Sequence, residues 1–130
     1  MIDSFEKLIK LRVVARHEDG VTVSIPLRAE LMNSAGVLHG GVIATLADEA
    51  VGMAVSNHTK GKRQITTTEL KVNYLLPVTG KRLSARCYLV RTGRHLCVGR
   101  VDLFDSTKRL TNSCPPALRV PRMRPAESLP

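Results

Sequence analysis

Hydrophobic residues recur at helical spacing between about residues 40 and 56, the longest such pattern in the chain. At 100° per residue, one face of the predicted helix collects Val42, Ile43, Leu46, Ala47, Ala50, Met53 and Ala54. The opposite side is also largely apolar, interrupted by Thr45, Asp48 and Glu49. A helix that is apolar nearly all round is expected to be buried on most sides, and two adjacent acids in it are costly unless paired or functional.

Alternating apolar and polar residues predict strands on both sides of this helix. Before it, Asp19-Gly20 predicts a turn that joins two strands into a hairpin. After it, the pattern predicts strands over residues 65–76, 83–90, 96–104 and near 109–113, where Pro115-Pro116 is expected to end the last strand. One buried helix and successive strands with short turns predict an α+β domain whose antiparallel sheet curls around the helix.

The length of 130 residues predicts one domain, which we place at residues 1–116, followed by a loose basic tail at 117–130. Hydrophobic residues make up 43% of the chain but include only four Phe and Tyr and no Trp, so the core must be aliphatic. No apolar run approaches the ~18–20 residues of a membrane span, and the first residues lack the order of a signal peptide. Three cysteines form no metal spacing and no even disulfide framework, so we expect a cytoplasmic protein without a bound metal.

The chain is basic, with a formal net charge of +9. Residues 81–130 hold 11 of the 20 Lys and Arg but only 3 of the 11 Asp and Glu. This excess indicates either an anionic partner or arginines that solvate the outer faces of strands. Nucleic acid is disfavoured, because few aromatics are available to stack on bases and no zinc-finger or helix-turn-helix pattern is present. A small molecule that carries phosphates fits the charge at least as well.

Candidate chemistry is concentrated where the predicted helix begins. Gly40-Gly41 would let a ligand approach the backbone closely, and the free N–H groups of a helix start would hold a developing oxyanion. Asp48 lies roughly 12 Å of helical rise beyond Gly40, so it cannot act on an atom bound there in its own chain. A second copy with its helix antiparallel could bring its Asp48 to this place, which predicts a dimer with composite sites.

Each of these residues also has a purely structural interpretation. The two glycines could serve close packing, His39 could cap the helix, and Asp48 could be a buried, hydrogen-bonded structural acid. The combination at these spacings weakens that interpretation.

The ordered set Asn33…Gly36…His39-Gly40-Gly41…Leu46-Ala47-Asp48, followed by residues 67–77 (TTELKVNYLLP), closely resembles the hotdog-fold acyl-CoA thioesterases. The nearest branch is the PaaI-like (phenylacetate-pathway) group, and the likeness covers about residues 20–112. It implies a hotdog fold, a curled antiparallel sheet wrapped around one long central helix. It also implies hydrolysis of an acyl- or aryl-CoA thioester to the free acid and CoA.

The resemblance implies a role for each matching residue. Gly40 N–H and the Asn33 side chain would bind and polarise the thioester carbonyl, with His39 supporting that site. Asp48 of the facing subunit would be the nucleophile or the general base for water, and Thr67 would help orient the water or the carboxylate. Glu49, beside the catalytic position but about 100° away on the helix, is ranked as structural or secondary.

The phosphates of CoA call for basic groups at the mouth of the site. The candidates that bind substrate or CoA are Gly41, the turn residues Arg91, Gly93 and Arg94, and the loop residues Lys60, Lys62 and Arg63. No cofactor is expected besides the CoA of the substrate. The expected partners are acyl-CoA and further copies of the chain, as a homodimer that pairs into a tetramer in this branch, with neither nucleic acid nor membrane. A non-catalytic acyl-CoA-binding hotdog protein is the main alternative, and a hotdog dehydratase and a nucleic-acid binder rank below it.

Overall fold

The computed structural model of the chain describes residues 4–62 and 65–120. Its helical elements are α1 (Phe5–Leu8), a short 3-10 helix (Ala29–Leu31) and α2 (Gly40–His58). Its strands are β1 (Arg12–His17), β2 (Gly20–Pro26), β3 (Thr66–Thr67), β4 (Asn73–Tyr74), β5 (Arg82–Thr92), β6 (Cys97–Asp105) and β7 (Leu110–Val120). The long helix and the hairpin at Asp19-Gly20 are therefore confirmed. No helix in the described part of the chain is long and apolar enough to cross a membrane.

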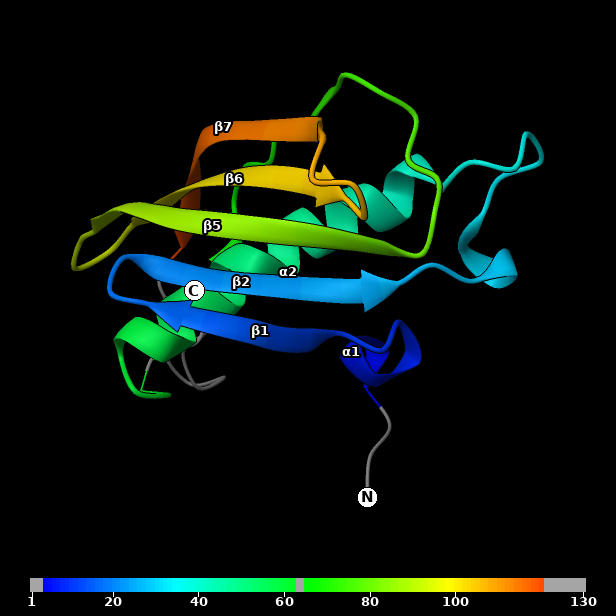
Figure 1. Cartoon of the computed structure of the whole chain (residues 1–130). Helices are drawn as coiled ribbons and strands as arrows, with labels where there is room; N and C mark the ends of the chain where they lie inside the picture. Colours follow the sequence, from blue (N-terminus) through cyan, green and yellow to red (C-terminus); the bar gives the residue numbers. More distant parts are fainter. Residues whose placement is uncertain (1–3, 63–64, 121–130) are drawn as a thin grey trace.

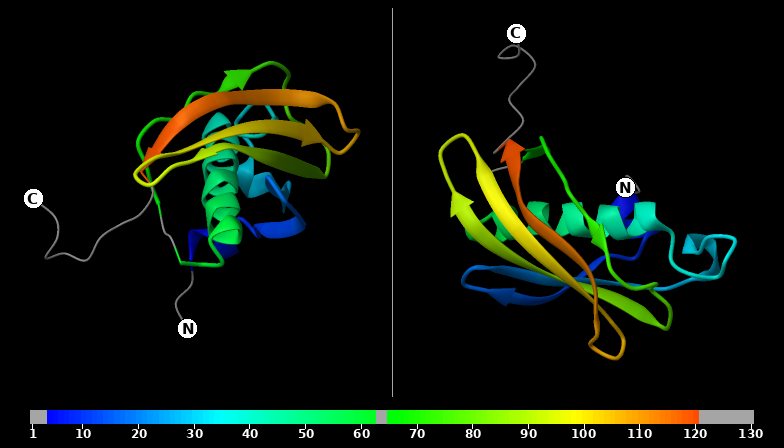
Figure 2. Two further views of the ribbon diagram at one scale, coloured as in Figure 1. Left: turned by 90° about the vertical axis from the view of Figure 1, so that its left-hand side faces the viewer. Right: turned by 90° about the horizontal axis from the view of Figure 1, so that it is seen from above.

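The strands form one antiparallel sheet in the order β1-β2-β5-β6-β7-β3, with β4 also paired to β7. Figures 1 and 2 show this sheet curving around α2, with β1 and β2 on one flank and β7 on the other. The predicted α+β architecture, a curled sheet around one long helix, is confirmed. The helix packs on β2, β5 and β6, so the sheet of this chain covers one face of α2 and leaves the other partly exposed.

The core lies between α2 and the inner face of the sheet, and it is aliphatic as predicted. Strand alternation turns every second residue inward, as with the buried Leu83, Ala85 and Cys87 of β5. Burial of each large aliphatic side chain contributes roughly 1.5–3 kcal/mol. At Gly99 of β6 the two layers approach closely, because a Cβ there would lie only 3.1 Å from the Val51 side chain of α2.

The predicted strand over residues 65–76 is wrong in its extent. Only Thr66–Thr67 and Asn73–Tyr74 pair with β7, and the segment between them is not in the ladder. This segment lies at the outer edge of the sheet, where β7 is its one neighbour among the described strands. An edge strand with one partner lacks the second ladder that keeps an interior strand regular.

The predicted end of the last strand at Pro115-Pro116 is also wrong, because β7 continues to Val120. The pairing with β6 passes from Val101↔Cys114 to Gly99↔Ala117, so β7 carries one extra residue at the two prolines. A bulge of this kind accommodates residues that cannot donate to the ladder. Residues 121–130 of the predicted tail lie outside the described residues.

Candidate active site

The N-terminus of α2 is built around two glycines and a histidine cap. His39 is the N-cap residue, and its Nδ1 accepts a hydrogen bond of 2.9 Å from the Gly41 N–H. A Cβ at Gly41 would lie 3.0 Å from this nitrogen, so glycine there leaves room for the cap. Within the described residues, the N–H of Gly40 has no hydrogen-bond acceptor. This N–H group of the first helical turn is therefore available to a ligand.

Asn33 lies beside this helix start, in a loop that orients its amide. Its Oδ1 accepts hydrogen bonds from the N–H groups of Ala35, at 2.9 Å, and Val37, at 3.2 Å. The loop is closed by a 2.8 Å bond from Asn33 N–H to the Val37 carbonyl, and Gly36 turns it with φ +79. Because both partners of Oδ1 are donors, Nδ2 is the amide atom left to donate to a ligand.

Asn33 and Gly40 together line a pocket of about 290 Å³. Its other lining residues have apolar side chains, apart from the Tyr74 hydroxyl, and they are Val37, Leu38, Ile43, Tyr74, Leu75, Leu76, Pro77 and Val78. A small apolar pocket with two hydrogen-bond donors at one place can hold an acyl group with its carbonyl at the helix start. The structure thus brings together the two predicted carbonyl-binding residues.

Asp48 and Thr67 form the second cluster of predicted site residues. The Thr67 hydroxyl, on the edge strand β3, donates to Oδ1 of Asp48 at 2.5 Å. This bond orients the carboxylate of Asp48, as predicted for a small hydroxyl residue at this position. Asp48 is eight residues along α2 from Gly40, about 12 Å of rise, so one chain does not bring the two clusters together.

Glu49 has the most perturbed carboxyl group of this region. Burial of its half-buried side chain, followed by the charges of Glu6 and Asp48, raises its pKa to about 7. Backbone and Ser4 hydrogen bonds, together with the bond from Glu49, lower the pKa of Glu6. The protonated Glu49 and the ionised Glu6 therefore join α1 to α2 as a carboxyl–carboxylate pair, which the sequence pattern did not indicate.

This pair predicts a stability that depends on pH. In the unfolded chain Glu49 loses its proton near pH 4.5, whereas in the folded protein it keeps the proton up to about pH 7. The unfolded state binds fewer protons in this window, so the free energy of unfolding falls as the pH rises through it and is flat above. Because the side chain stays partly exposed, we expect a loss of only about 1–2 kcal/mol.

Urea unfolding at pH 5 and pH 8 measures this loss, and Glu49→Gln serves as the matched variant without the titration. The difference in the free energy of unfolding between pH 5 and pH 8 should be smaller in Glu49→Gln than in the wild type, by the amount attributed to the Glu6–Glu49 pair. An equal pH dependence in both proteins would contradict the assignment.

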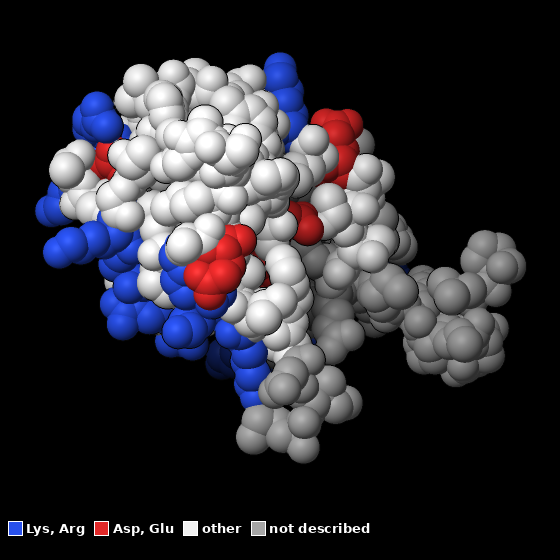
Figure 3. Space-filling view, turned by 90° about the vertical axis from the view of Figure 1, so that its right-hand side faces the viewer, with Lys and Arg blue, Asp and Glu red and all other residues white. Residues whose placement is uncertain are grey.

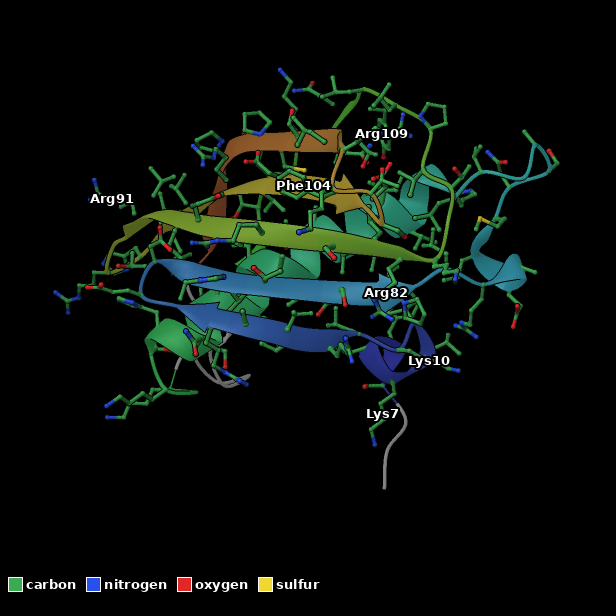
Figure 4. The ribbon with its side chains drawn as sticks, viewed as in Figure 1. Lys7, Lys10, Arg82, Arg91, Phe104 and Arg109 are labelled. Atoms are coloured by element: carbon green, nitrogen blue, oxygen red, sulfur yellow. The ribbon has the colours of Figure 1, made fainter. Side chains whose placement is uncertain are left out.

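Of the predicted substrate- and CoA-binding residues, Gly41 lies at the start of α2, whereas the residues of the 91–94 turn lie at the opposite end of this helix. Arg91, Gly93 and Arg94 belong to the β5–β6 hairpin, and Figure 4 shows Arg91 at the far end of the sheet. Arg91 lines a cavity of about 570 Å³ with His58 of the last turn of α2. Gly93 permits the tight turn, since a Cβ there would lie 2.9 Å from the Leu96 carbonyl oxygen.

The basic loop after α2 lies at the same end of the helix. Lys60 and Lys62 are exposed there, and Lys60 lines a cavity of about 370 Å³ with Met53 and Ser56 of α2. Arg63 lies outside the described residues. The structure therefore brings the described basic candidates to the C-terminal end of α2, and it does not bring them to the Gly40 pocket of the same chain.

Other arginines of the basic second half have structural roles on the outer face of the sheet. Arg86 forms an ion pair of 2.5 Å with Asp19, and the guanidinium groups of Arg86 and Arg100 lie 4.0 and 4.2 Å from the centre of the Tyr88 ring. Arg82 donates to the Ser24 hydroxyl at 2.8 Å. Figure 3 shows Lys and Arg gathered on its left-hand side, where the outer face of the sheet lies. Part of the positive charge is thus a solvated sheet face.

No three His, Cys, Asp or Glu side chains are grouped to hold a metal ion in residues 4–62 and 65–120. The three cysteines are buried, and they belong to the core.

Comparison with known proteins identifies the family of the chain. The model of the thioesterase superfamily matches residues 35–112. The chain is 34% identical over 82 residues to the medium/long-chain acyl-CoA thioesterase YigI of Escherichia coli, and the match covers 53% of each protein. A Haemophilus influenzae relative that carries an esterase name is 27% identical over 100 residues, which cover 77% of this chain and 72% of that protein.

Among solved structures, the PaaI protein of the phenylacetic acid degradation operon of Escherichia coli superposes with a TM-score of 0.82. The superposition covers 94% of this chain and 86% of that chain at 17% sequence identity, so the likeness concerns the fold. The hotdog fold expected from the sequence is confirmed.

Proposed function

The chain belongs to the thioesterase superfamily and is a thioester hydrolase, and we propose that its substrate is an acyl- or aryl-CoA, cleaved to the free acid and CoA. The observation that carries this proposal is the pocket of about 290 Å³ that Asn33 and Gly40 line together with mostly apolar side chains at the start of α2. Similarity to the acyl-CoA thioesterase YigI supports the CoA thioester as substrate, although this chain spans only about half of that relative.

The thioester carbonyl would accept hydrogen bonds from Gly40 N–H and Asn33 Nδ2, and the positive end of the α2 dipole lies at the same place. As a general base, Asp48 removes a proton from water, and the hydroxide attacks the carbonyl carbon to form a tetrahedral oxyanion. The C–S bond then breaks, and the CoA thiolate leaves and recovers the proton. As a nucleophile, Asp48 attacks the carbonyl carbon and expels the CoA thiolate to form an anhydride. Water hydrolyses the anhydride to the free acid and the Asp48 carboxylate, and the released proton goes to the thiolate.

Asp48 reaches the carbonyl only from a second copy of the chain. Three observations support a dimer with composite sites. Asp48 and Thr67 lie at the β3 edge of the sheet, where the edge strand has no second neighbour within the part of the chain that the structure describes. Tyr74, Leu75 and Leu76 leave 55, 53 and 40% of their surface exposed beside this edge, and the face of α2 turned away from the sheet is partly exposed.

An antiparallel pair of α2 helices also explains where the basic residues lie. A helix of 19 residues is about 28 Å long, so Arg91, Arg94 and Lys60 are far from the Gly40 pocket of their own chain. In the pair, the C-terminal end of one helix lies toward the N-terminal end of the other. The basic end of one copy would then face the phosphates of a CoA bound at the pocket of its partner.

A panel of acyl- and aryl-CoA thioesters tests the proposal, with release of the CoA thiol measured by a thiol-reactive dye. We expect the purified protein to turn over at least one class of thioester well above the uncatalysed rate. Tight binding of acyl-CoA without thiol release across the panel would contradict catalysis and favour a non-catalytic acyl-CoA-binding protein.

A further inference from the structure

The peptide group between Gly40 and Gly41 is held at both ends by side chains. Its N–H donates to Nδ1 of His39 at 2.9 Å, and its carbonyl oxygen accepts from the Tyr74 hydroxyl at 2.9 Å. A carbonyl oxygen has two lone pairs, so the Tyr74 bond adds to the bond that this oxygen makes within the helix. This peptide plane of the first helical turn is therefore held by Tyr74 of β4 on one side and by the N-cap residue His39 on the other.

Tyr74 is placed for this contact and contributes little to the core. Its strand β4 is paired with β7, where Asn112 lies opposite, and 55% of the Tyr74 surface is exposed. The edge of its ring lies against Gly40, because a Cβ built on that glycine would be 3.3 Å from Cε1 and 3.5 Å from Cζ and Oη. Tyr74 also lines the pocket that Asn33 and Gly40 share.

Two consecutive glycines create a need for such a clamp. Without Cβ atoms, Gly40 and Gly41 permit close approach of a ligand, but they have the widest conformational freedom of any residues. A hydrogen-bond donor stabilises a developing oxyanion only when its direction is set before the reaction. Holding the plane between the two glycines restricts ψ of Gly40 and φ of Gly41, and with them the direction of the adjacent Gly40 N–H.

We propose that Tyr74 is a positioning residue for the oxyanion site, which holds the first peptide of α2 so that Gly40 N–H points at the reacting carbonyl. This inference rests on the proposed acyl-CoA hydrolysis. Tyr74 acts through the Gly40 backbone and takes no proton from the substrate. Its effect belongs to the transition state, in which the carbonyl oxygen is negative, more than to the bound substrate.

Tyr74→Phe tests this role, because it removes the hydroxyl and keeps the ring that packs on Gly40. We expect kcat to fall about three- to tenfold, the effect of one neutral hydrogen bond, while KM changes less than about twofold. Affinity for a thioether analogue of acyl-CoA, which has no carbonyl, should stay unchanged. The matched control is Tyr88→Phe, because Tyr88 lies between two arginines on the outer face of the sheet. This substitution should leave kcat and KM unchanged.

A second measurement does not depend on turnover. Hydrogen exchange of the Gly41 amide, followed by NMR, should accelerate about three- to tenfold in Tyr74→Phe and stay the same in Tyr88→Phe. If the wild-type protein releases no thiol, the proposed function fails while this exchange rate still decides whether the clamp exists.

Three results would overturn the role of Tyr74. The first is an unchanged kcat in Tyr74→Phe, and the second is an equal loss of affinity for the thioether analogue. The third is unchanged exchange at Gly41, which would show that the first turn is rigid without the hydroxyl.

Discussion

Asp48→Asn is expected to lower kcat for acyl-CoA hydrolysis by at least about 100-fold, the usual scale for the loss of a general base. Asparagine has the shape of aspartate and still accepts the hydrogen bond from Thr67, so the fold and the orientation of the side chain should be kept. It cannot take a proton from water or form an anhydride, and both proposed routes therefore stop. Thiol release measures the loss, and thermal unfolding checks that the protein remains folded.

Glu49→Gln is the matched control, one residue further along α2. It changes a neighbouring carboxyl group whose pKa is already raised to about 7 by burial and by Glu6 and Asp48. Because Glu49 pairs with Glu6 of α1, we expect an effect on stability and at most a severalfold effect on kcat. Unchanged turnover in Asp48→Asn would refute the mechanism, and a collapse of turnover only in Glu49→Gln would transfer the catalytic role to Glu49.

Mixing two inactive variants is expected to restore activity if each site uses residues from two chains. One variant carries Gly40→Val, whose side chain would meet the Tyr74 ring at the oxyanion site, and the other carries Asp48→Asn. A mixed dimer contains one intact site and one site with both defects. With random pairing, half of the dimers are mixed and about a quarter of all sites are intact, so we expect up to about 25% of wild-type activity.

Differently tagged copies, co-expressed and purified through both tags, isolate the mixed dimers. Half of the sites in this pure fraction are intact, so its expected activity rises to up to about 50% of wild type. Asn33→Ala replaces Gly40→Val if the valine variant does not fold. The control pairs Asp48→Asn with Thr67→Val, both on the carboxylate side, and should restore nothing. Verified mixed dimers of Gly40→Val and Asp48→Asn that stay inactive would show that one chain builds the whole site.

Local patterns predicted the elements whose pairing partners are close in sequence, and the helix whose apolar periodicity extends over many residues. The apolar period of α2 and the turn at Asp19-Gly20 specify their structures from neighbouring residues, and both were confirmed. The close backbone at Gly40-Gly41 follows from residue type alone, and the distance to Asp48 follows from helical rise. Those two facts were enough to expect two clusters instead of one, as the structure shows within one chain.

The errors occurred where pairing between distant segments decides the structure. Residues 65–76 have strand propensity, but their place at the edge beside β7 alone limits the ladder to two short pieces. Pro115 and Pro116 end strands in general, yet a bulge against β6 carries β7 to Val120. Propensity describes one strand, whereas register and edge position belong to the sheet.

The contacts that Glu49 and Gly40 make with distant residues could not be predicted from the sequence, again because they join segments far apart in the chain. Glu6 lies more than forty positions before Glu49, so their contact depends on how α1 packs against α2 in the tertiary structure. Tyr74 reaches the carbonyl of Gly40 across 34 positions, and nothing in the spacing of residues 67–77 marks it for that contact.

The sequence by itself determined the long helix, its start at two glycines, and the position of Asp48 two turns further along. It also determined that the core is aliphatic. Each of these features depends on residue type and short-range periodicity. Only the tertiary structure decided that Asn33 and Gly40 share one pocket, that Thr67 holds Asp48, and that Tyr74 clamps the first peptide of α2. These are contacts between segments far apart in the chain. They form when the sheet curls around the helix, and no local pattern specifies which side chains then meet.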